Sequence, residues 1–460
     1  MKHLRSENYV VYTYSAIAIE RILALTHDKN EAVVDSANVT TLSRDILQRL
    51  YQLIEKDTAP EKIQENEFLM RCVMRVLLVI KEGVLPISDF VLQNFINILR
   101  VIRHNPSNPR FYYYQFEGIG ALVRYAAPSQ AEKLETALYS PFAEILSNDV
   151  QEFTPYVFQI FAALLEANPS ASLSEYYKGL IQPVLTPTLW LSKGNTPALV
   201  RLLTSLIKRG GADMARNHQV EPVLGVFQQL ISQKSNESYG FDLLEACIAH
   251  FPTPAISAYF TTMFSLLMTR LSSSPSQTFT IRFVRFYHFL SARTDVDLGC
   301  DPVITIIEAI QQGVFTKIYL NIILPETQKL ARPADRKLAV VSLTRTLAYS
   351  QAFAEKYQKG WAFTCEALLK IMLNPPLPVT ADDLIPDQDV DDLSFGVGFT
   401  QLNTCKRPAT DPYPEIADVK GWIGTCLKEA DAQQGGNVGR FIQQRLSPET
   451  QQTLLAYMQS

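Results

Sequence analysis

Apolar side chains recur along most of the chain with the spacing of an α-helix. Between residues 66 and 80 they return every three or four positions, which places them on one side of a helix with 3.6 residues per turn. The members of this row are Phe68, Leu69, Cys72, Val73, Val76, Leu77 and Ile80. The pattern returns over residues 153–164, 199–206, 223–230 and 260–271, without a convincing run of the alternation typical of strands. The sequence therefore predicts an all-α fold.

Residues that favour the start of a helix follow one another at nearly equal distances. The candidate starts, which lie 40 to 46 residues apart, are Asn66, Asn108, Asp149, Asn195, Glu237 and Gln277. Asn and Asp side chains accept hydrogen bonds from the free N–H groups of a first helical turn. One further helix fits between consecutive starts, as over residues 89–103 and 130–147. A two-helix period near 40 residues is typical of HEAT and armadillo repeats and predicts a right-handed superhelical solenoid of about nine or ten helix pairs.

The regular spacing is interrupted twice. After Gln277 the next clear start is Asp335, so a short extra helix is expected within residues 294–313. The second interruption begins at Asn374, and from there to Cys405 the chain has no Lys or Arg. This acidic segment contains Asp382, Asp383, Asp387, Asp389, Asp391 and Asp392. We therefore predict a HEAT solenoid over residues 1–373, an acidic proline-containing loop over 374–412, and C-terminal helices over 413–460 that complete the solenoid.

The six aspartates allow two interpretations. A calcium loop of the EF-hand type needs ligands at alternating positions, a central glycine and a closing Glu, and this segment has neither residue where it is required. A solvated acidic loop and a docking site for a basic partner surface both stay possible. The second interpretation makes the six aspartates candidate partner-binding residues.

Composition and the absence of motifs exclude several function classes. The 460 residues carry 42 basic and 46 acidic side chains, which argues against a strongly basic nucleic-acid binder. The six cysteines are far apart, which argues against structural zinc and fits a reducing compartment. The sequence has no P-loop, no GxSxG and no HExxH motif, so we predict no enzyme, no cofactor and no metal site. The most apolar run, residues 68–80, is too short to span a membrane and contains Arg71 and Arg75, so membrane insertion is not expected.

Three ungapped stretches carry a resemblance to a known family. Residues 66–71 read NEFLMR, residues 148–159 read NDVQEFTPYVFQ, and residues 194–203 read GNTPALVRLL. They resemble the importin-α export receptors, the CAS-type exportins of the importin-β (karyopherin) superfamily. The similarity covers most of residues 4–373 and, more weakly, the tail.

The resemblance implies a nuclear export receptor. Such a receptor binds importin-α together with Ran-GTP in the nucleus, passes the nuclear pore by contacting pore proteins, and releases both ligands in the cytoplasm after GTP hydrolysis. It has no active site. Family members are much longer and match this chain in their C-terminal part, so the chain is expected to be a C-terminal fragment. The alternative is a generic HEAT-repeat scaffold or adaptor subunit, for which the periodicity would look the same.

The resemblance also suggests that the second helix of each pair lines the concave face of the solenoid. Arg282 and Arg285 lie three residues apart and share one side of such a helix, with Arg293 farther along. They are therefore the candidate members of a basic partner-binding strip. A solvated helix face is the competing interpretation.

Overall fold

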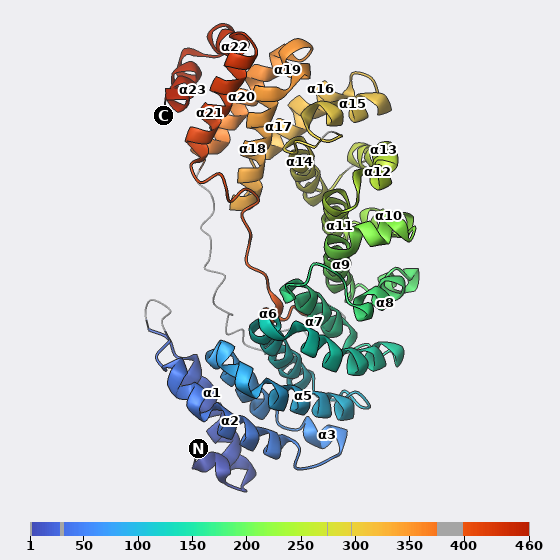
Figure 1. Ribbon diagram of the computed structural model, residues 1–460, viewed down its shortest axis with the longest axis vertical. Helices are drawn as coiled ribbons and strands as arrows, with labels where there is room; N and C mark the ends of the chain where they lie inside the picture. Colours follow the sequence, from blue (N-terminus) through green and yellow to red (C-terminus); the bar gives the residue numbers. More distant parts are fainter. Residues whose placement is uncertain (1, 28–31, 274, 296, 375–398, 460) are drawn as a thin grey trace. The chain divides into compact units, whose positions relative to one another are not determined.

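The computed structural model describes residues 2–27, 32–273, 275–295, 297–374 and 399–459 (Figure 1). Regular structure in these ranges is helical, apart from one antiparallel bridge between Thr26 and Ala32. The predicted all-α fold is confirmed. The six aspartates of the acidic segment lie outside the described residues.

The chain forms two compact units. Unit 1 comprises Met1–Gly210 and Asp383–Arg407, and unit 2 comprises Gly211–Asp382 and Pro408–Ser460. The boundary near residue 210 falls inside α9 (Thr196–Arg216). The division predicted from the sequence, into residues 1–373, 374–412 and 413–460, stays a prediction.

Unit 1 contains the helices of the first half of the chain, and α9 starts in it. Its α-helices are α1 (Tyr9–Ala24), α2 (Ser36–Ile54), α3 (Pro60–Ile63), α4 (Glu67–Ile80), α5 (Ser88–Ile102), α6 (Pro109–Ser147), α7 (Thr154–Ala167) and α8 (Glu175–Val184). Its 3₁₀ helices are η1 (His3–Arg5), η2 (Lys81–Ile87), η3 (Pro187–Leu191) and η7 (Asn403–Cys405). The last of these follows the six aspartates of the acidic segment in the sequence and belongs to unit 1.

Unit 2 contains the remaining helices. They are α10 (Val220–Ile231), α11 (Glu237–His250), α12 (Thr253–Ile256), η4 (Ser257–Tyr259), α13 (Phe260–Ser272), α14 (Gln277–Ser291), α15 (Cys300–Ile310), α16 (Val314–Ile318), the π-helix η5 (Tyr319–Ile323), α17 (Leu324–Thr327), α18 (Pro333–Tyr349), α19 (Gln351–Glu355), α20 (Gln358–Leu373), α21 (Val419–Gln433), α22 (Asn437–Arg445) and α23 (Pro448–Gln459). The extra helix expected within residues 294–313 is present as α15.

Five of the six predicted helix starts are confirmed. Asn66, Asn108 and Asn195 directly precede α4, α6 and α9, while Glu237 and Gln277 are the first residues of α11 and α14. The Asn108 side chain caps α6 by accepting hydrogen bonds from the backbone N–H groups of Arg110 and Phe111, at 3.1 and 3.3 Å.

The predicted start at Asp149 is wrong, because α7 begins at Thr154. Asp149 has a φ of +50°, in the left-handed region of the backbone. Pro155 occupies the first turn of α7, where the missing N–H of proline removes no helical hydrogen bond. A helix that began at residue 149 would place this proline in its interior, so the helix starts later.

The long helix α6 consists of two arms. Gln130 interrupts it with non-helical angles, φ −132° and ψ 26°, and Pro128 lies two residues earlier. A proline inside a helix removes one hydrogen bond and clashes with the preceding turn, so Pro128 weakens the helix directly before this break. The second arm is the predicted helix over residues 130–147.

Polar contacts recur at the spacing of the predicted repeat. Side chains reach partners 39 to 41 residues away in both units. The pairs are Asn108 with Glu67, Arg103 with Glu144, Arg209 with the carbonyl of Asn168, Ser276 with Glu237, and Arg282 with Asp242. Residues about 40 positions apart therefore occupy neighbouring repeats and contact each other, as the predicted period requires.

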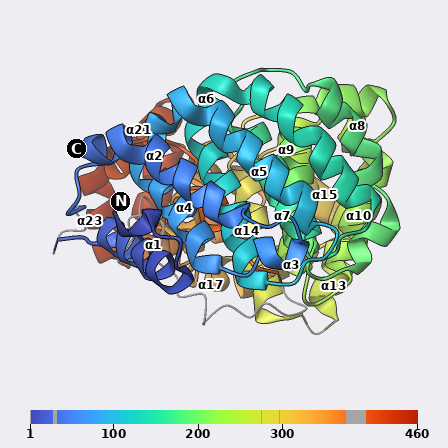
Figure 2. The same ribbon diagram turned by 90° about the horizontal axis from the view of Figure 1, so that it is seen from below.

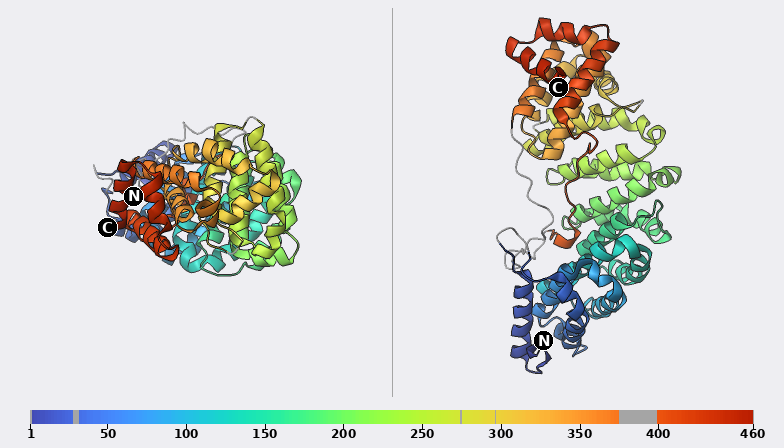
Figure 3. Two further views of the ribbon diagram at one scale, coloured as in Figure 1. Left: turned by 90° about the horizontal axis from the view of Figure 1, so that it is seen from above. Right: turned by 60° about the vertical axis from the view of Figure 1, so that its left-hand side comes forward.

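Helices one repeat apart pack side by side inside each unit. In unit 1, α4 contacts α2 and α6, and α6 contacts α7 (Figure 2). In unit 2, α14 contacts α11 and α18, and α18 contacts α20 and α21. The right-hand view of Figure 3 shows the last helices, in red, gathered against the orange helices of the same unit. Each helix pair thus buries its apolar side against its neighbours, as repeat proteins require.

Candidate functional site

The most elaborate polar site in unit 1 is formed where residues 399–407 lie against α6 and α7 (Figure 1). Leu402, Asn403, Thr404 and Cys405 are each at most 4 % exposed. A segment without α-helix or strand is buried this deeply only if its backbone groups find partners. The side chains of two helices provide those partners.

Glu117 of α6 is the first anchor. Its carboxylate accepts hydrogen bonds from the backbone N–H of Asn403 at 2.6 Å and of Thr404 at 2.9 Å. It also accepts one from the Thr404 hydroxyl at 2.7 Å. Because Glu117 is only 2 % exposed, these bonds replace the water that an ionised carboxylate would otherwise need.

Tyr113, one turn before Glu117, completes this anchor. Its hydroxyl donates to the Glu117 carboxylate at 2.7 Å and accepts from the side-chain amide of Asn403 at 3.3 Å. Burial, followed by the negative charge of Glu117, raises the pKa of Tyr113 well above its usual value. The phenol therefore remains a hydrogen-bond donor throughout the physiological pH range.

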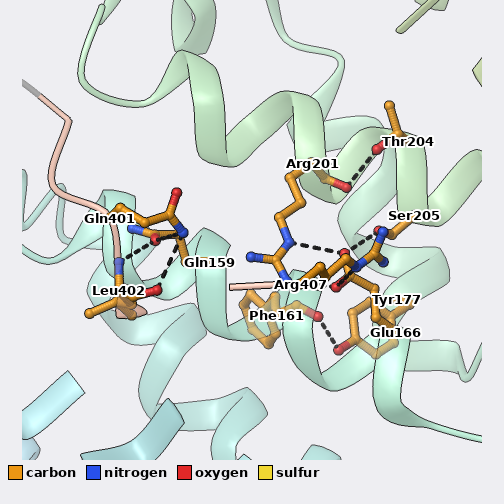
Figure 4. A network of polar contacts seen from close by, with 10 residues as sticks. All are labelled: Gln159, Phe161, Glu166, Tyr177, Arg201, Thr204, Ser205, Gln401, Leu402 and Arg407. Atoms are coloured by element: carbon orange, nitrogen blue, oxygen red, sulfur yellow. Dashed lines mark hydrogen bonds and ion pairs between the residues drawn. The ribbon is translucent and has the colours of Figure 1, made fainter. Parts of the chain in front are cut away.

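Gln159 of α7 is the second anchor (Figure 4). Its amide oxygen accepts from the backbone N–H of Leu402 at 2.8 Å, as Figure 4 shows. Its amide nitrogen donates to the carbonyl of Thr400 at 3.0 Å. One side chain thus satisfies a donor and an acceptor of an extended backbone, as a neighbouring strand would.

Glu166, at the end of α7, is the third anchor (Figure 4). Arg201 of α9 donates to it at 3.1 and 2.6 Å, Ser205 donates at 2.8 Å, and Arg407 forms an ion pair with it. Burial lowers the pKa of Arg201, but the hydrogen bond and charge of Glu166 outweigh burial and raise the pKa overall. Both arginines therefore share one carboxylate.

Gly120 of α6 provides the space that the segment occupies. A Cβ atom at this position would overlap the Thr404 hydroxyl and lie 3.1 Å from the Cys405 sulfur. Any larger residue at position 120 would therefore compete with the docked segment for the same volume.

The other candidate residues, Arg282 and Arg285, both lie on α14 in unit 2. Arg282 forms an ion pair with Asp242 and lies 3.7 Å from Glu245. Arg285 pairs with Glu245 and with Asp335, the latter at 2.5 Å. Their side chains are 9 % and 23 % exposed. Both charges are thus met inside the unit, and partner binding by these arginines stays a prediction.

Burial and charge act in opposite directions on Glu245 and on Arg285. Burial raises the pKa of Glu245, although the charges of Arg285 and Arg282 oppose this shift. Burial lowers the pKa of Arg285, but Glu245 and Asp335 together raise it above its ordinary value. Removing an arginine here would leave buried negative charge without compensation.

His288, one turn beyond Arg285, is fully buried between two hydroxyl groups. Its ring nitrogens lie 2.9 Å from the Ser342 hydroxyl and 2.7 Å from the Thr327 hydroxyl. Burial lowers the pKa of His288 to about 3. The ring is therefore held neutral by its surroundings.

We expect His288 to make unit 2 sensitive to acid. The unfolded chain binds a proton at this residue below about pH 6.5, and the folded chain does not until pH falls to about 3. The free energy of unfolding should therefore fall by up to about 1.4 kcal/mol per pH unit in this window. Urea unfolding at several pH values should show a smaller slope for His288→Gln than for the wild type. An unchanged slope would contradict the burial of a neutral ring, and His104→Gln at an exposed position is the control.

The aromatic residues near position 113 pack against the neighbouring helix α7. Tyr112 contacts Phe153 with ring centroids 5.1 Å apart, and Phe116 stacks on Tyr156 at 5.0 Å. Sequence reasoning missed Glu117 and Gln159, which lie among these apolar residues. A buried charge in such a run was the available signal, but its partners lie more than 240 residues away.

Two further properties of the described residues bear on function. They contain no group of three or more His, Cys, Asp or Glu side chains placed to hold a metal ion. No single helix among them is long and apolar enough to cross a membrane, while the bent pair Cys300–Ile310 and Val314–Thr327 has the required length and composition.

Comparison with known proteins identifies the relatives of this chain. The family model described as CAS/CSE protein, C-terminus, matches residues 20–457. The importin-alpha re-exporter of Schizosaccharomyces pombe is 36 % identical over 466 residues, which covers 99 % of this chain and 48 % of the relative. Exportin-2 of Homo sapiens is 31 % identical over 472 residues, covering 100 % of this chain and 47 % of the relative. The chain thus spans about half the length of the curated relatives it matches.

A solved structure agrees with the sequence matches. The exportin Cse1 in its cargo-free, cytoplasmic state superimposes with a TM-score of 0.84 at 32 % identity, covering 100 % of this chain and 46 % of that chain. The similarity confirms the predicted HEAT-type solenoid fold and the resemblance to CAS-type exportins. The chain matches the C-terminal region of these proteins. It therefore belongs to the CAS/CSE exportin family, whose members are transport receptors and not enzymes.

Proposed function

We propose that this chain is part of a nuclear export receptor that carries importin-α from the nucleus to the cytoplasm as a complex with Ran-GTP. The observation that supports the proposal best is the match of the family model to residues 20–457, together with relatives named importin-alpha re-exporters. The proposal includes shuttling through the nuclear pore with contacts to pore proteins. It requires no catalytic residue, no cofactor, no nucleic acid and no membrane insertion.

The acidic segment is the docking element in this proposal. Asp387, Asp389, Asp391 and Asp392 carry four of its six negative charges within six residues. Basic surfaces of importin-α and of Ran are the partners that such a charge would attract. Long-range attraction of this kind chiefly raises the rate of association, and salt weakens it.

A pull-down tests the proposal. The longest natural form of the protein and the chain itself are immobilised and offered importin-α with GTP-loaded Ran, GDP-loaded Ran or no Ran. We expect the longest form to retain importin-α most strongly with GTP-loaded Ran. Retention that ignores the nucleotide, or no retention at all, would favour the generic HEAT scaffold.

A further inference from the structure

We propose that residues 400–407 form a latch, a peptide-like segment that docks into a groove on α6 and α7 and opens as a unit while both helices stay folded. The occupant of the groove is this chain's own segment. The proposal rests on contacts within unit 1 and does not depend on the export function.

The groove consists of acceptors and donors already held in place by helices. Glu117 and Tyr113 lie one turn apart on α6, and Gln159 lies on α7. Together they bind the backbone N–H groups of Leu402, Asn403 and Thr404 and the carbonyl of Thr400. Backbone groups are the main target, so the groove recognises the backbone of this segment, including the start of η7, and not only its side chains.

The groove also has a shape requirement. Thr404 lies over Gly120, where a methyl group would occupy the place of its hydroxyl. Gly118 lies two residues earlier on the same helix and faces the core instead. A Cβ atom at this position would lie 2.6 Å from the Phe95 ring. A substitution at Gly120 therefore affects the groove, whereas a substitution at Gly118 affects the packing of the core.

The latch adds little to the apolar core that holds the helices together. That core is formed by aromatic contacts among helices, such as Phe116 with Phe142, Phe153 and Tyr156. The latch contributes two buried apolar side chains, Leu402 and the smaller Cys405. Glu117, Gln159 and Tyr113 are polar and can be hydrated when it leaves. Segments with few apolar contacts open locally at lower free energy than the global unfolding transition.

Opening would have two consequences for unit 1. It would expose the Glu117 carboxylate to water, and it would release Arg407 from Glu166, which keeps Arg201 and Ser205 as partners. It would also free the chain at Thr400, which lies eight residues after Asp392, the last of the six aspartates. Thr400 is therefore held against α7 when the latch is closed and is released when the latch opens.

Hydrogen–deuterium exchange of the whole chain tests the latch. In the wild type, fragments within residues 399–407 should exchange at least tenfold faster than the buried parts of α6 and α7, yet slower than an unprotected peptide. Exchange in step with α6 and α7 would overturn the proposal, because the segment would then be an integral part of the core.

Two variants separate the latch from the helices. Gly120→Ala should speed exchange over 399–407 at least tenfold and leave α7 unchanged. Gly118→Ala is the matched control, and it should affect α6 and α5 before the latch. Thr404→Gly changes only the latch, so it should also accelerate exchange over 399–407 even if Gly120→Ala destabilises α6. Wild-type protection in both Gly120→Ala and Thr404→Gly would contradict the assignment of the groove.

Discussion

Replacing Arg285 by alanine is expected to lower the free energy of unfolding of unit 2 by about 3–5 kcal/mol, because it leaves buried carboxylates without their counterion. Arg285 bridges Glu245 of α11 and Asp335 of α18. The substitution therefore removes the ion pairs that connect α14 to its two neighbours, α11 and α18. Urea unfolding followed by Trp361 and Trp422 fluorescence measures the loss.

The loss of stability in Arg285→Ala should depend on pH. Burial already raises the pKa of Glu245, and removing Arg285 takes away the strongest influence that lowers it. The carboxyl group should then protonate more readily, so the destabilisation should be smaller near pH 5 than near pH 8. Arg293→Ala is the control, because its partner Asp295 is 45 % exposed and such pairs contribute below about 1 kcal/mol. Equal losses for the two arginines would contradict a structural role of Arg285.

Changing Asp387, Asp389, Asp391 and Asp392 to Asn is expected to slow association with importin-α by about tenfold or more at low salt. The reason is that clustered charge of one sign accelerates encounters with an oppositely charged surface by roughly 10–1,000-fold. Stopped-flow or biosensor association rates with importin-α and with Ran-GTP, measured in the longest natural form of the protein, report the effect.

Salt provides the internal control for this experiment. Screening acts over about 8–10 Å near physiological ionic strength, so the difference between variant and wild type should shrink as salt rises. Dissociation rates should change much less than association rates. If neither association rate changes at low salt, the acidic segment is a linker, and the six aspartates belong to a solvated loop instead of a docking site.

The helical repeat was predictable because its signals are local. Capping residues such as Asn108 and the 3.6-residue spacing of apolar positions act within one or two turns, and they recur in every repeat. The start at Asp149 was wrong for an equally local reason, since Pro155 determines where α7 begins. The family, and with it the proposed function, came from the resemblance, because periodicity alone does not distinguish an exportin from a scaffold.

The sites were less predictable because their partners are distant in sequence. Arg282 and Arg285 do share one helix side, but the carboxylates that neutralise them lie 37 to 50 residues away in the sequence. The latch is still farther from its partners in the sequence, because Asn403 lies 286 positions after Glu117. No periodic pattern marks residues 400–407, and only the folded structure brings them to α6 and α7.

The thermodynamic coupling between importin-α and Ran-GTP tests the central claim most directly. Titration of the longest natural form of the protein with importin-α, in the presence and absence of saturating GTP-loaded Ran, gives the ratio of the two affinities. The account predicts that Ran-GTP tightens importin-α binding at least about tenfold and, because coupling is reciprocal, that importin-α tightens Ran-GTP binding by the same factor. Equal affinities for importin-α with and without Ran-GTP would contradict it.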